Sequence, residues 1–187
     1  MEKLIEAFGE MARLSAEAEK AFMDTISRKE IKRKTLLQNE GKVCDHIYFI
    51  EKGLARTFYY KDGKDVTYWI AAENDFVGAM GSFFSRAISN KCVETLEDSI
   101  LWVFDHDKLE ALYANSKELE KMGRLFANYG ITLLEKRFDD FHFMTARQRY
   151  KLLLSNHPQI VQRVSLGVIA SYLGITQETL SRIRGRI

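Results

Sequence analysis

Cysteine and proline are both scarce in this chain of 187 residues, which contains two cysteines and one proline. Cys44 and Cys92 are far apart and lack the C-x-x-C spacing that is typical of zinc and iron–sulfur sites. So few cysteines also argue against a disulfide-rich secreted protein and are typical of a reducing cytoplasm. We therefore expect two buried, apolar thiols rather than a metal site.

Long apolar runs are absent too, and none approaches the roughly 20 residues that a membrane-spanning helix needs. The N-terminal sequence MEKLIEAFGEM is charged and helix-forming, which is unlike a signal peptide. We therefore expect a cytoplasmic protein without membrane contact.

Recognisable catalytic patterns are also lacking. The four histidines are scattered along the chain, and no nucleophile–base pair, carboxylate pair or metal-ligand spacing stands out. We expect no enzymatic activity, and we predict no cofactor and no metal site.

Positive charge, by contrast, is concentrated at the C-terminal end. The whole chain has a net charge of +2, but residues 144–187 contain seven Lys and Arg against a single Glu. That segment therefore has an excess of six positive charges, and the rest of the chain has an excess of four negative charges. A basic end joined to a mildly acidic body is typical of nucleic-acid contact confined to one part of a protein.

Hydrophobic periodicity divides the chain into a helical start, a β-rich middle and a helical end. Residues 1–27 are expected to be helical, with a break near Ser15. Residues 28–104 contain short runs of aromatic and β-branched residues, separated by turn signals of which Asp62-Gly63 is the clearest. We predict an antiparallel sandwich or roll of roughly eight strands, interrupted by a short helical turn near Gly78 and Gly81.

After residue 106 the pattern is helical again. A short helix over 107–115 precedes a long one over 116–143 that Ser116 caps. One stripe of this long helix has the spacing of a coiled-coil seam with a polar end, at Leu119, Met122, Phe126, Tyr129, Leu133, Lys136, Asp140 and Phe143. A second apolar stripe contains Leu125, Ile131, Leu134 and Phe138. A helix with two apolar faces needs two partners, and we expect one of them to be the same helix of a second subunit.

The last twenty-two residues, 166–187, have the pattern of a helix-turn-helix. Gly174 supplies the turn, and Thr176 is a suitable N-cap for a second helix whose Leu180 and Ile183 face back to the first. The remaining side chains of the second helix then point outward, where they can reach base edges or phosphates. The alternative is a helical hairpin that merely caps a small core.

Charge and periodicity change together near Met144, so we predict three parts in an α+β fold. These are a sensor β-roll with N-terminal helices over 1–115, a dimerisation helix over 116–143, and a DNA-binding domain over 144–187. Within the third part, we expect Pro158 to end a helix that Thr145 caps. Three leucines, Leu152, Leu153 and Leu154, would anchor that helix to the helix-turn-helix.

This order of elements resembles the Crp/Fnr family of bacterial transcription regulators, and especially the short Crp-like regulators of Bacteroidetes. The resemblance extends from about Arg28 onward and is carried by HIYFIEKGLARTFY, NDFVGAMGSFF and GITQETLSRIR. It implies a roll with the cyclic nucleotide-binding fold (a double-stranded β-helix or jelly roll), a homodimer, promoter DNA as the target and RNA polymerase as a partner.

The resemblance implies base contacts from Gln177, Glu178 and Arg182. Arginine suits guanine, glutamate accepts from cytosine N4 and glutamine suits adenine. Because relatives often have arginine where this chain has Gln177, a different preferred sequence follows. Phosphate contacts or capping are expected from Thr176, Thr179, Ser181, Arg184 and Arg186, with Arg147 and Arg149 as weaker phosphate candidates. We expect no full β wing after this helix.

An effector pocket is implied as well, at Gly78, Ala79, Met80, Gly81, Ser89, Asn90, Lys91 and Thr132. Cyclic-AMP binders of this family have a Gly-Glu-Leu turn for the ribose and an Arg-Ser pair for the phosphate. Here an alanine replaces the glutamate, and Ser and Asn align with the Arg-Ser pair, so the ribose acceptor and the phosphate counter-charge are lost. We expect another small-molecule effector, or none, in place of cyclic AMP.

Together these features predict a dimeric, sequence-specific DNA-binding regulator with an altered sensor pocket. The alternative is a ligand-binding or protein-interaction module with little DNA-binding role, and the basic C-terminal segment argues against it.

Overall fold

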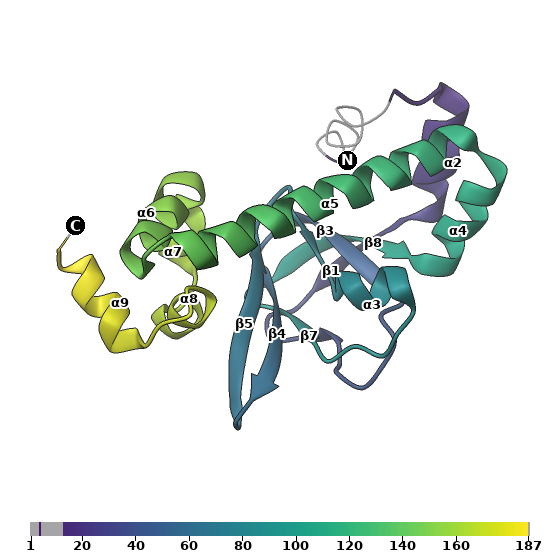
Figure 1. The fold of residues 1–187 in the computed structure, drawn as a ribbon. Coiled ribbons are helices and arrows are strands. Elements are labelled where there is room, and N and C mark those ends of the chain that lie inside the picture. Colours follow the sequence, from purple (N-terminus) through teal and green to yellow (C-terminus); the bar gives the residue numbers. More distant parts are fainter. Residues whose placement is uncertain (1–3, 5–12, 187) are drawn as a thin grey trace.

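The computed structural model describes residue 4 and residues 13–186, which form three consecutive parts (Figure 1). A β-roll occupies one end of the molecule. Helix α5 (Lys117–Phe143) runs along the roll and beyond it, and the C-terminal helices form the other end. The predicted α+β class is confirmed.

The roll consists of two four-stranded sheets, with strand orders β1-β8-β3-β6 and β2-β7-β4-β5, in which all pairings are antiparallel. Side chains from both sheets share one buried core cluster, which includes Ile50 and Leu101 from the first sheet and Ala55 and Val93 from the second. The eight strands confirm the predicted roll. Their bounds are β1 (Ser27–Ile31), β2 (Leu36–Gln38), β3 (His46–Lys52), β4 (Ala55–Lys61), β5 (Lys64–Ala71), β6 (Phe76–Val77), β7 (Cys92–Thr95) and β8 (Ser99–Asp105).

The predicted hairpin at Asp62-Gly63 joins β4 to β5. Lys61 pairs with Lys64 across it, and both central residues have positive φ, 51° at Asp62 and 72° at Gly63. A two-residue turn of this kind matches the right-handed twist of the strands, and Asp-Gly is one of the pairs that adopt it at least cost. The β4–β5 hairpin is therefore encoded locally.

Helices cover one end of the roll. Ser15 caps α2 (Ala16–Thr25), whose Phe22 is buried against the roll, and the break expected near Ser15 is this cap. Helix α3 (Met80–Ser85) is the short turn expected near Gly78, and α4 (His106–Asn115) precedes α5. Leu4 is buried, whereas the other N-terminal positions expected to be helical, up to Ala12, lie outside the described residues. Both cysteines are buried and free, as expected.

The structure shows which stripe of α5 packs on the roll. Leu119 and Met122, which begin the expected coiled-coil seam, are each 1% exposed in the core of the roll, and Phe126 packs against the same cluster. The first half of this stripe therefore packs on the roll, whereas Tyr129 and Phe143 further along it are 49% and 80% exposed. On the second stripe, Ile131 is 63% exposed and Phe138 is 62% exposed. Most of the second stripe is therefore exposed in the single chain, although its Leu125 packs against the core of the roll.

The C-terminal part contains one more helix than expected. Thr145 caps α6 (Ala146–Asn156) with a full capping box, but Pro158 is the first residue of α7 (Pro158–Arg163) rather than a simple helix end. Proline suits this position because the first N–H groups of a helix have no partner inside it. Of the three leucines expected to anchor α6, Leu153 is buried and Leu154 is exposed. The remaining helices are α8 (Leu166–Tyr172) and α9 (Gln177–Arg184).

Candidate functional site

Helices α8 and α9 form the helix-turn-helix, and local chemistry determines its geometry. Gly174 has φ +69°, a conformation that glycine adopts at little cost. The backbone N–H of Ile175 then donates to the carbonyl of Ala170 at 3.0 Å, which closes the turn. Leu180 is fully buried between the helices, so the opposite side of α9 is turned toward solvent.

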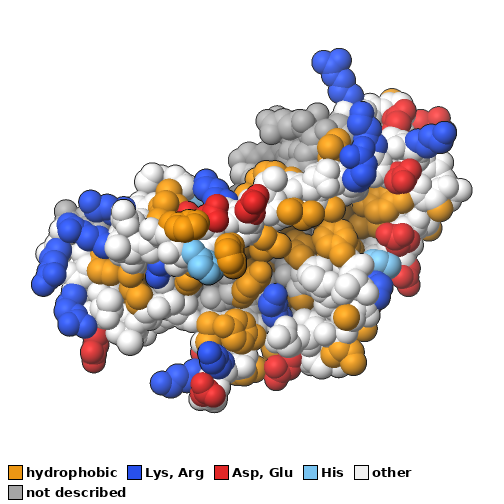
Figure 2. All heavy atoms as spheres, viewed as in Figure 1, with side chains coloured by type: hydrophobic (Ala, Val, Ile, Leu, Met, Phe, Trp, Pro, Cys, Tyr) orange, Lys and Arg blue, Asp and Glu red, His pale blue; other side chains and the backbone are white. Residues whose placement is uncertain are grey.

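That outward side carries most of the predicted DNA-binding residues. Exposed side chains lie at Thr176, Gln177, Glu178, Ser181, Arg182, Arg184 and Arg186, and Thr179 is half-buried. The Thr176 hydroxyl accepts from the Thr179 backbone N–H at 3.2 Å, which makes Thr176 the N-cap that the sequence predicts. Because all of these residues lie on one helix and its two ends, the structure brings the predicted set together. Figure 2 shows Lys and Arg side chains gathered around the α9 end of the molecule.

Gln177 lies against the first helix of the pair. A Cβ added to Gly167 would be 2.4 Å from the Nε2 atom of Gln177, so the carboxamide occupies the space above this glycine. The carboxamide of Gln177 therefore packs against α8 in this conformation. Rotation about its side-chain bonds can turn it outward.

The two weaker phosphate candidates, Arg147 and Arg149, have structural partners. Arg147 donates from Nη2 to the carbonyl of Arg186 at 3.0 Å, just beyond the end of α9. Arg149 donates to the carbonyls of Met144 and Leu173 at 2.6 and 3.0 Å, and its guanidinium stacks on Phe141. Arg149 thus joins the end of α5 to the end of α8, with two of its nitrogen atoms bonded to backbone carbonyls.

Several residues of the predicted effector pocket are buried and have partners of their own. Ala79 is 2% exposed, and a Cβ added to Gly78 would lie 2.7 Å from Cγ2 of Ile47. Ser89 is buried, its hydroxyl bonded to the backbone carbonyl and N–H of Lys91.

The remaining residues of that predicted set differ in their exposure. Nζ of Lys91 lies 3.8 Å from the ring centroid of Tyr68, and burial lowers the pKa of Lys91. Met80 is half-buried, while Gly81, Asn90 and Thr132 are exposed, and the hydroxyl of Thr132 donates to the carbonyl of Tyr129. None of the eight predicted residues lines either of the two cavities described next.

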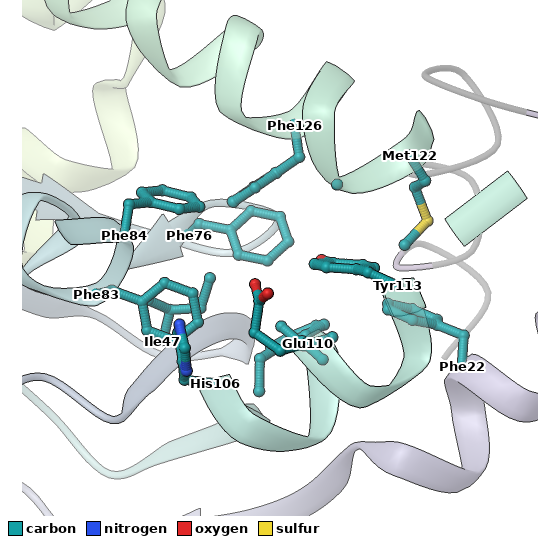
Figure 3. A pocket seen from close by; sticks show the side chains of 13 residues that line it. Phe22, Ile47, Phe76, Phe83, Phe84, His106, Glu110, Tyr113, Met122 and Phe126 are labelled. Atoms are coloured by element: carbon teal, nitrogen blue, oxygen red, sulfur yellow. The ribbon is translucent and has the colours of Figure 1, made fainter. Parts of the chain in front are cut away.

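One cavity lies where α4 and α5 meet the roll, and aromatic side chains line most of it (Figure 3). The ring centroids of Phe76 and Phe126 are 4.6 Å apart, and that of Phe84 is 6.5 Å from Phe126. The carboxylate of Glu110 points toward the space between these rings, and burial raises the pKa of neighbouring Tyr113 to about 12. This cavity is an apolar gap between the roll and the long helix.

The other cavity, called the junction cavity below, lies where β5, α5, α6 and the end of α8 meet. Its lining combines apolar and basic side chains: Trp69, Leu133, Lys136, Arg137, Asp140, Phe141, Arg149, Leu152, Leu153, Asn156, His157, Tyr172 and Leu173. Arg137, which lines this cavity, was not among the predicted site residues. A signal was present in the sequence, because this charged residue lies four positions from Leu133 and four from Phe141 on the long helix.

Polar contacts fix the C-terminal helices against the roll. Arg163 of α7 donates from Nη1 and Nη2 to the two carboxylate oxygens of Glu73, both at 2.8 Å, and also pairs with Glu97. This contact lowers the pKa of Glu73 to about 2. The hydroxyl of Ser171 on α8 accepts from the backbone N–H of Thr67 on β5 at 2.8 Å. Sequence reasoning missed these contacts because they join residues about a hundred positions apart.

Known proteins include relatives of the roll. The family model described as "cyclic nucleotide-binding domain" matches residues 28–116, from β1 to the cap of α5. Residues 28–116 are similar to this family over slightly less than half of the chain. A curated relative, the anaerobic regulatory protein of Bacillus subtilis, is 31% identical over 105 residues. The alignment covers 55% of this chain and 42% of that relative, so the chain spans less than half the length of the relative it matches.

Solved structures extend the likeness beyond this domain. FixK2 from Bradyrhizobium japonicum has a TM-score of 0.70 at 17% identity, over 86% of this chain and 83% of FixK2. The c-di-GMP responsive regulator CLP of Xanthomonas campestris has a TM-score of 0.65 at 18% identity, over 92% and 91% of the two chains. A regulator from Eubacterium rectale assigned to the Crp/Fnr family has a TM-score of 0.63 at 20% identity, over 91% and 82%. The chain has the Crp/Fnr regulator fold.

Neither a metal-binding cluster nor a membrane-spanning helix occurs among the described residues. No group of three or more His, Cys, Asp or Glu side chains placed to hold a metal ion occurs in this part of the chain. Within the same residues, no helix has the length and apolar composition needed to cross a bilayer.

Proposed function

We propose that this protein is a cytoplasmic, dimeric regulator that binds promoter DNA through α9 and contacts RNA polymerase there. The exposed polar face of α9 supports the proposal most directly. Its outward residues offer the donors and acceptors that read base edges in a major groove, whereas its buried Leu180 holds it against α8. The surrounding excess of Lys and Arg suits the phosphate backbone.

The second face of α5 supplies the dimer contact in this proposal. Gly130, Leu134 and Phe138 follow one another at spacings of four, and Ile131 lies three residues before Leu134. A Cβ on Gly130 would meet nothing within 4 Å, so its own subunit does not require a glycine there. A glycine inside a helix costs about 1 kcal/mol relative to alanine, and close approach of a second α5 would explain its presence. Two parallel copies would place the two α9 helices for successive major grooves, about 34 Å apart.

A ligand-binding or protein-interaction module without DNA binding is the second candidate. The similarity of the roll to the cyclic nucleotide-binding family is compatible with it. It does not account for the polar outward face of α9, which nothing else in the described chain covers. A regulator also needs no catalytic group, in keeping with the expectation that the protein is not an enzyme.

Selection from a random-sequence DNA pool, followed by gel-shift titration of the selected duplex, tests the proposal. We expect a palindromic site, an affinity that falls steeply with added salt, and a loss of at least about tenfold in the double variant Arg182→Ala, Gln177→Ala. Lys151→Ala, at an exposed position of α6 with the same loss of one positive charge, is the control and should cost much less. Binding that survives the double variant unchanged would refute the role of α9.

A further inference from the structure

The junction cavity holds more positive than negative charge. Lys136, Arg137 and Arg149 line it together with a single carboxylate, Asp140. In the described chain, neither guanidinium has a carboxylate within salt-bridge distance. Their hydrogen-bond and stacking partners among the described residues are neutral: backbone carbonyls, and the rings of Phe141 and Tyr172.

These two cations differ from the buried arginine of the roll. Arg56, which is 8% exposed, bonds to the carboxylates of both Asp65 and Glu94. Arg137 has no such partner, and burial lowers its pKa. The Nε–H of Arg149 is fully buried and has no hydrogen-bond partner among the described residues. Burying an unpaired cation is costly, and an anion at the same place would offset much of that cost.

Both guanidiniums also lie close to one ring. Their Cζ atoms are 4.9 Å (Arg137) and 4.7 Å (Arg149) from the ring centroid of Phe141. Two like charges held around one side chain repel each other, and a local dielectric constant below that of water strengthens this repulsion. An oxyanion beside them would replace this repulsion with two charge-assisted hydrogen bonds.

We propose that the junction cavity binds a small oxyanion, a carboxylate or phosphate carried on an apolar body about the size of one aromatic ring. The apolar body follows from the rest of the lining, which includes Trp69, Leu133 and Leu152. The size follows from the cavity volume of about 140 Å³, close to the ~150 Å³ of an engineered cavity that holds benzene.

The occupant would touch all three parts of the chain at once. Trp69 belongs to β5 of the roll, Arg137 to the long helix and Arg149 to the first helix of the C-terminal part. Any effect of such an anion on DNA affinity rests on the proposed function. Binding itself does not, so it can be measured on the full-length protein without DNA.

Calorimetric titration of the full chain with sodium benzoate at constant ionic strength tests the site, with the fluorescence of Trp69 as a second signal. We expect saturable binding of one benzoate per chain, weaker binding of inorganic phosphate, and no binding of benzyl alcohol, which has the ring but no charge. Arg137→Gln should weaken benzoate binding by at least about tenfold, because it removes a charge-assisted bond. Arg124→Gln removes the same charge from an exposed position of the same helix and should have no effect.

Leu133→Phe provides a second variant that fills the cavity and keeps all of its charges. It should abolish benzoate binding even if Arg137→Gln proves to be poorly folded, and Trp69→Phe should remove the fluorescence change. The assignment would be overturned if benzoate and benzyl alcohol bound with equal affinity. It would also be overturned if Arg124→Gln and Arg137→Gln bound benzoate with equal affinity. Binding that persists in Leu133→Phe would place the anion elsewhere and would overturn it too.

Discussion

Glu73 shows how a single residue links the two ends of the molecule. Its carboxylate accepts twice from Arg163 and once from the backbone N–H of Gly53, and these contacts lower its pKa to about 2. A carboxyl group whose pKa is depressed by folding stabilises the folded state above its unfolded pKa. That contribution is lost as the pH falls from about 4.5 toward about 2.

Glu73→Gln should therefore destabilise the protein at pH 7 and have little effect near pH 2. We expect a cost of about 1 kcal/mol at pH 7, because the pair is partly exposed to solvent. Urea unfolding at several pH values measures the difference between variant and wild type. Glu17→Gln, at an exposed position without a salt bridge in the described chain, is the control. If the difference in unfolding free energy between variant and wild type did not decrease in acid, the charge of Glu73 would not be the cause of its stabilising effect.

Cyclic AMP offers a test of the altered pocket. Ala79 stands where the resemblance implies a ribose-binding glutamate, and the Ser89 hydroxyl is already bonded to the backbone of Lys91. Neither can replace a carboxylate or an arginine, so millimolar cyclic AMP should leave the melting temperature unchanged in a thermal-shift assay. Sodium phosphate of equal ionic strength serves as the reference. A rise of several degrees specific to cyclic AMP would contradict the prediction.

The identity of a residue predicted its place in the local backbone better than its distant hydrogen-bond partners. Thr176 caps α9 and Gly174 forms the turn, both through residues close in the sequence, and the structure places both as the sequence predicts. Arg149 is different, because nothing in its local sequence shows that two distant carbonyls take up its donors. The same applies to Ser89, whose burial depends on the fold of the whole roll.

At the scale of elements, the long helix shows what periodicity can and cannot predict. Spacing identified two apolar stripes on α5, but both are similar in apolar content, so the sequence did not reveal which one faces the roll. The structure does, because Leu119 and Met122 are buried in the roll and Phe138 is not. Pro158 is a similar case, since the sequence showed that a helix boundary was present and not that a new helix begins there.

Phe138→Asp should convert the protein from dimer to monomer. The side chain is 62% exposed in the single subunit, so the substitution should leave the subunit folded while it puts two carboxylates into the dimer contact. We expect self-association to weaken by at least about a hundredfold, or about 3 kcal/mol. Sedimentation equilibrium measures it, and Asn128→Asp on another exposed face of α5 is the matched control. A Phe138→Asp protein that remains dimeric would show that the dimer forms elsewhere.

At the scale of the whole molecule, the roll and the C-terminal helices share a core. One cluster of buried side chains combines Leu54, Ile70 and Ala72 of the roll with Ile169, Leu180 and other residues of the C-terminal helices. These helices thus bury part of their apolar surface on β5 instead of on one another. A short helical segment has little core of its own, so this shared surface should account for much of its stability.

Ile70→Ala should consequently loosen α8 and α9 more than it loosens the roll. Ile70 is 4% exposed, and removal of such a side chain costs about 2–4 kcal/mol in general. Native-state hydrogen exchange measures the effect, and we expect the amides of α8 and α9 to exchange faster while those of β3 and β8 change less. Val93→Ala, at a fully buried position in the core between the two sheets, is the control and should affect the roll first. If both variants loosened the two regions equally, the chain would unfold as one cooperative unit, and a signal could not pass from roll to α9 by loosening this contact alone.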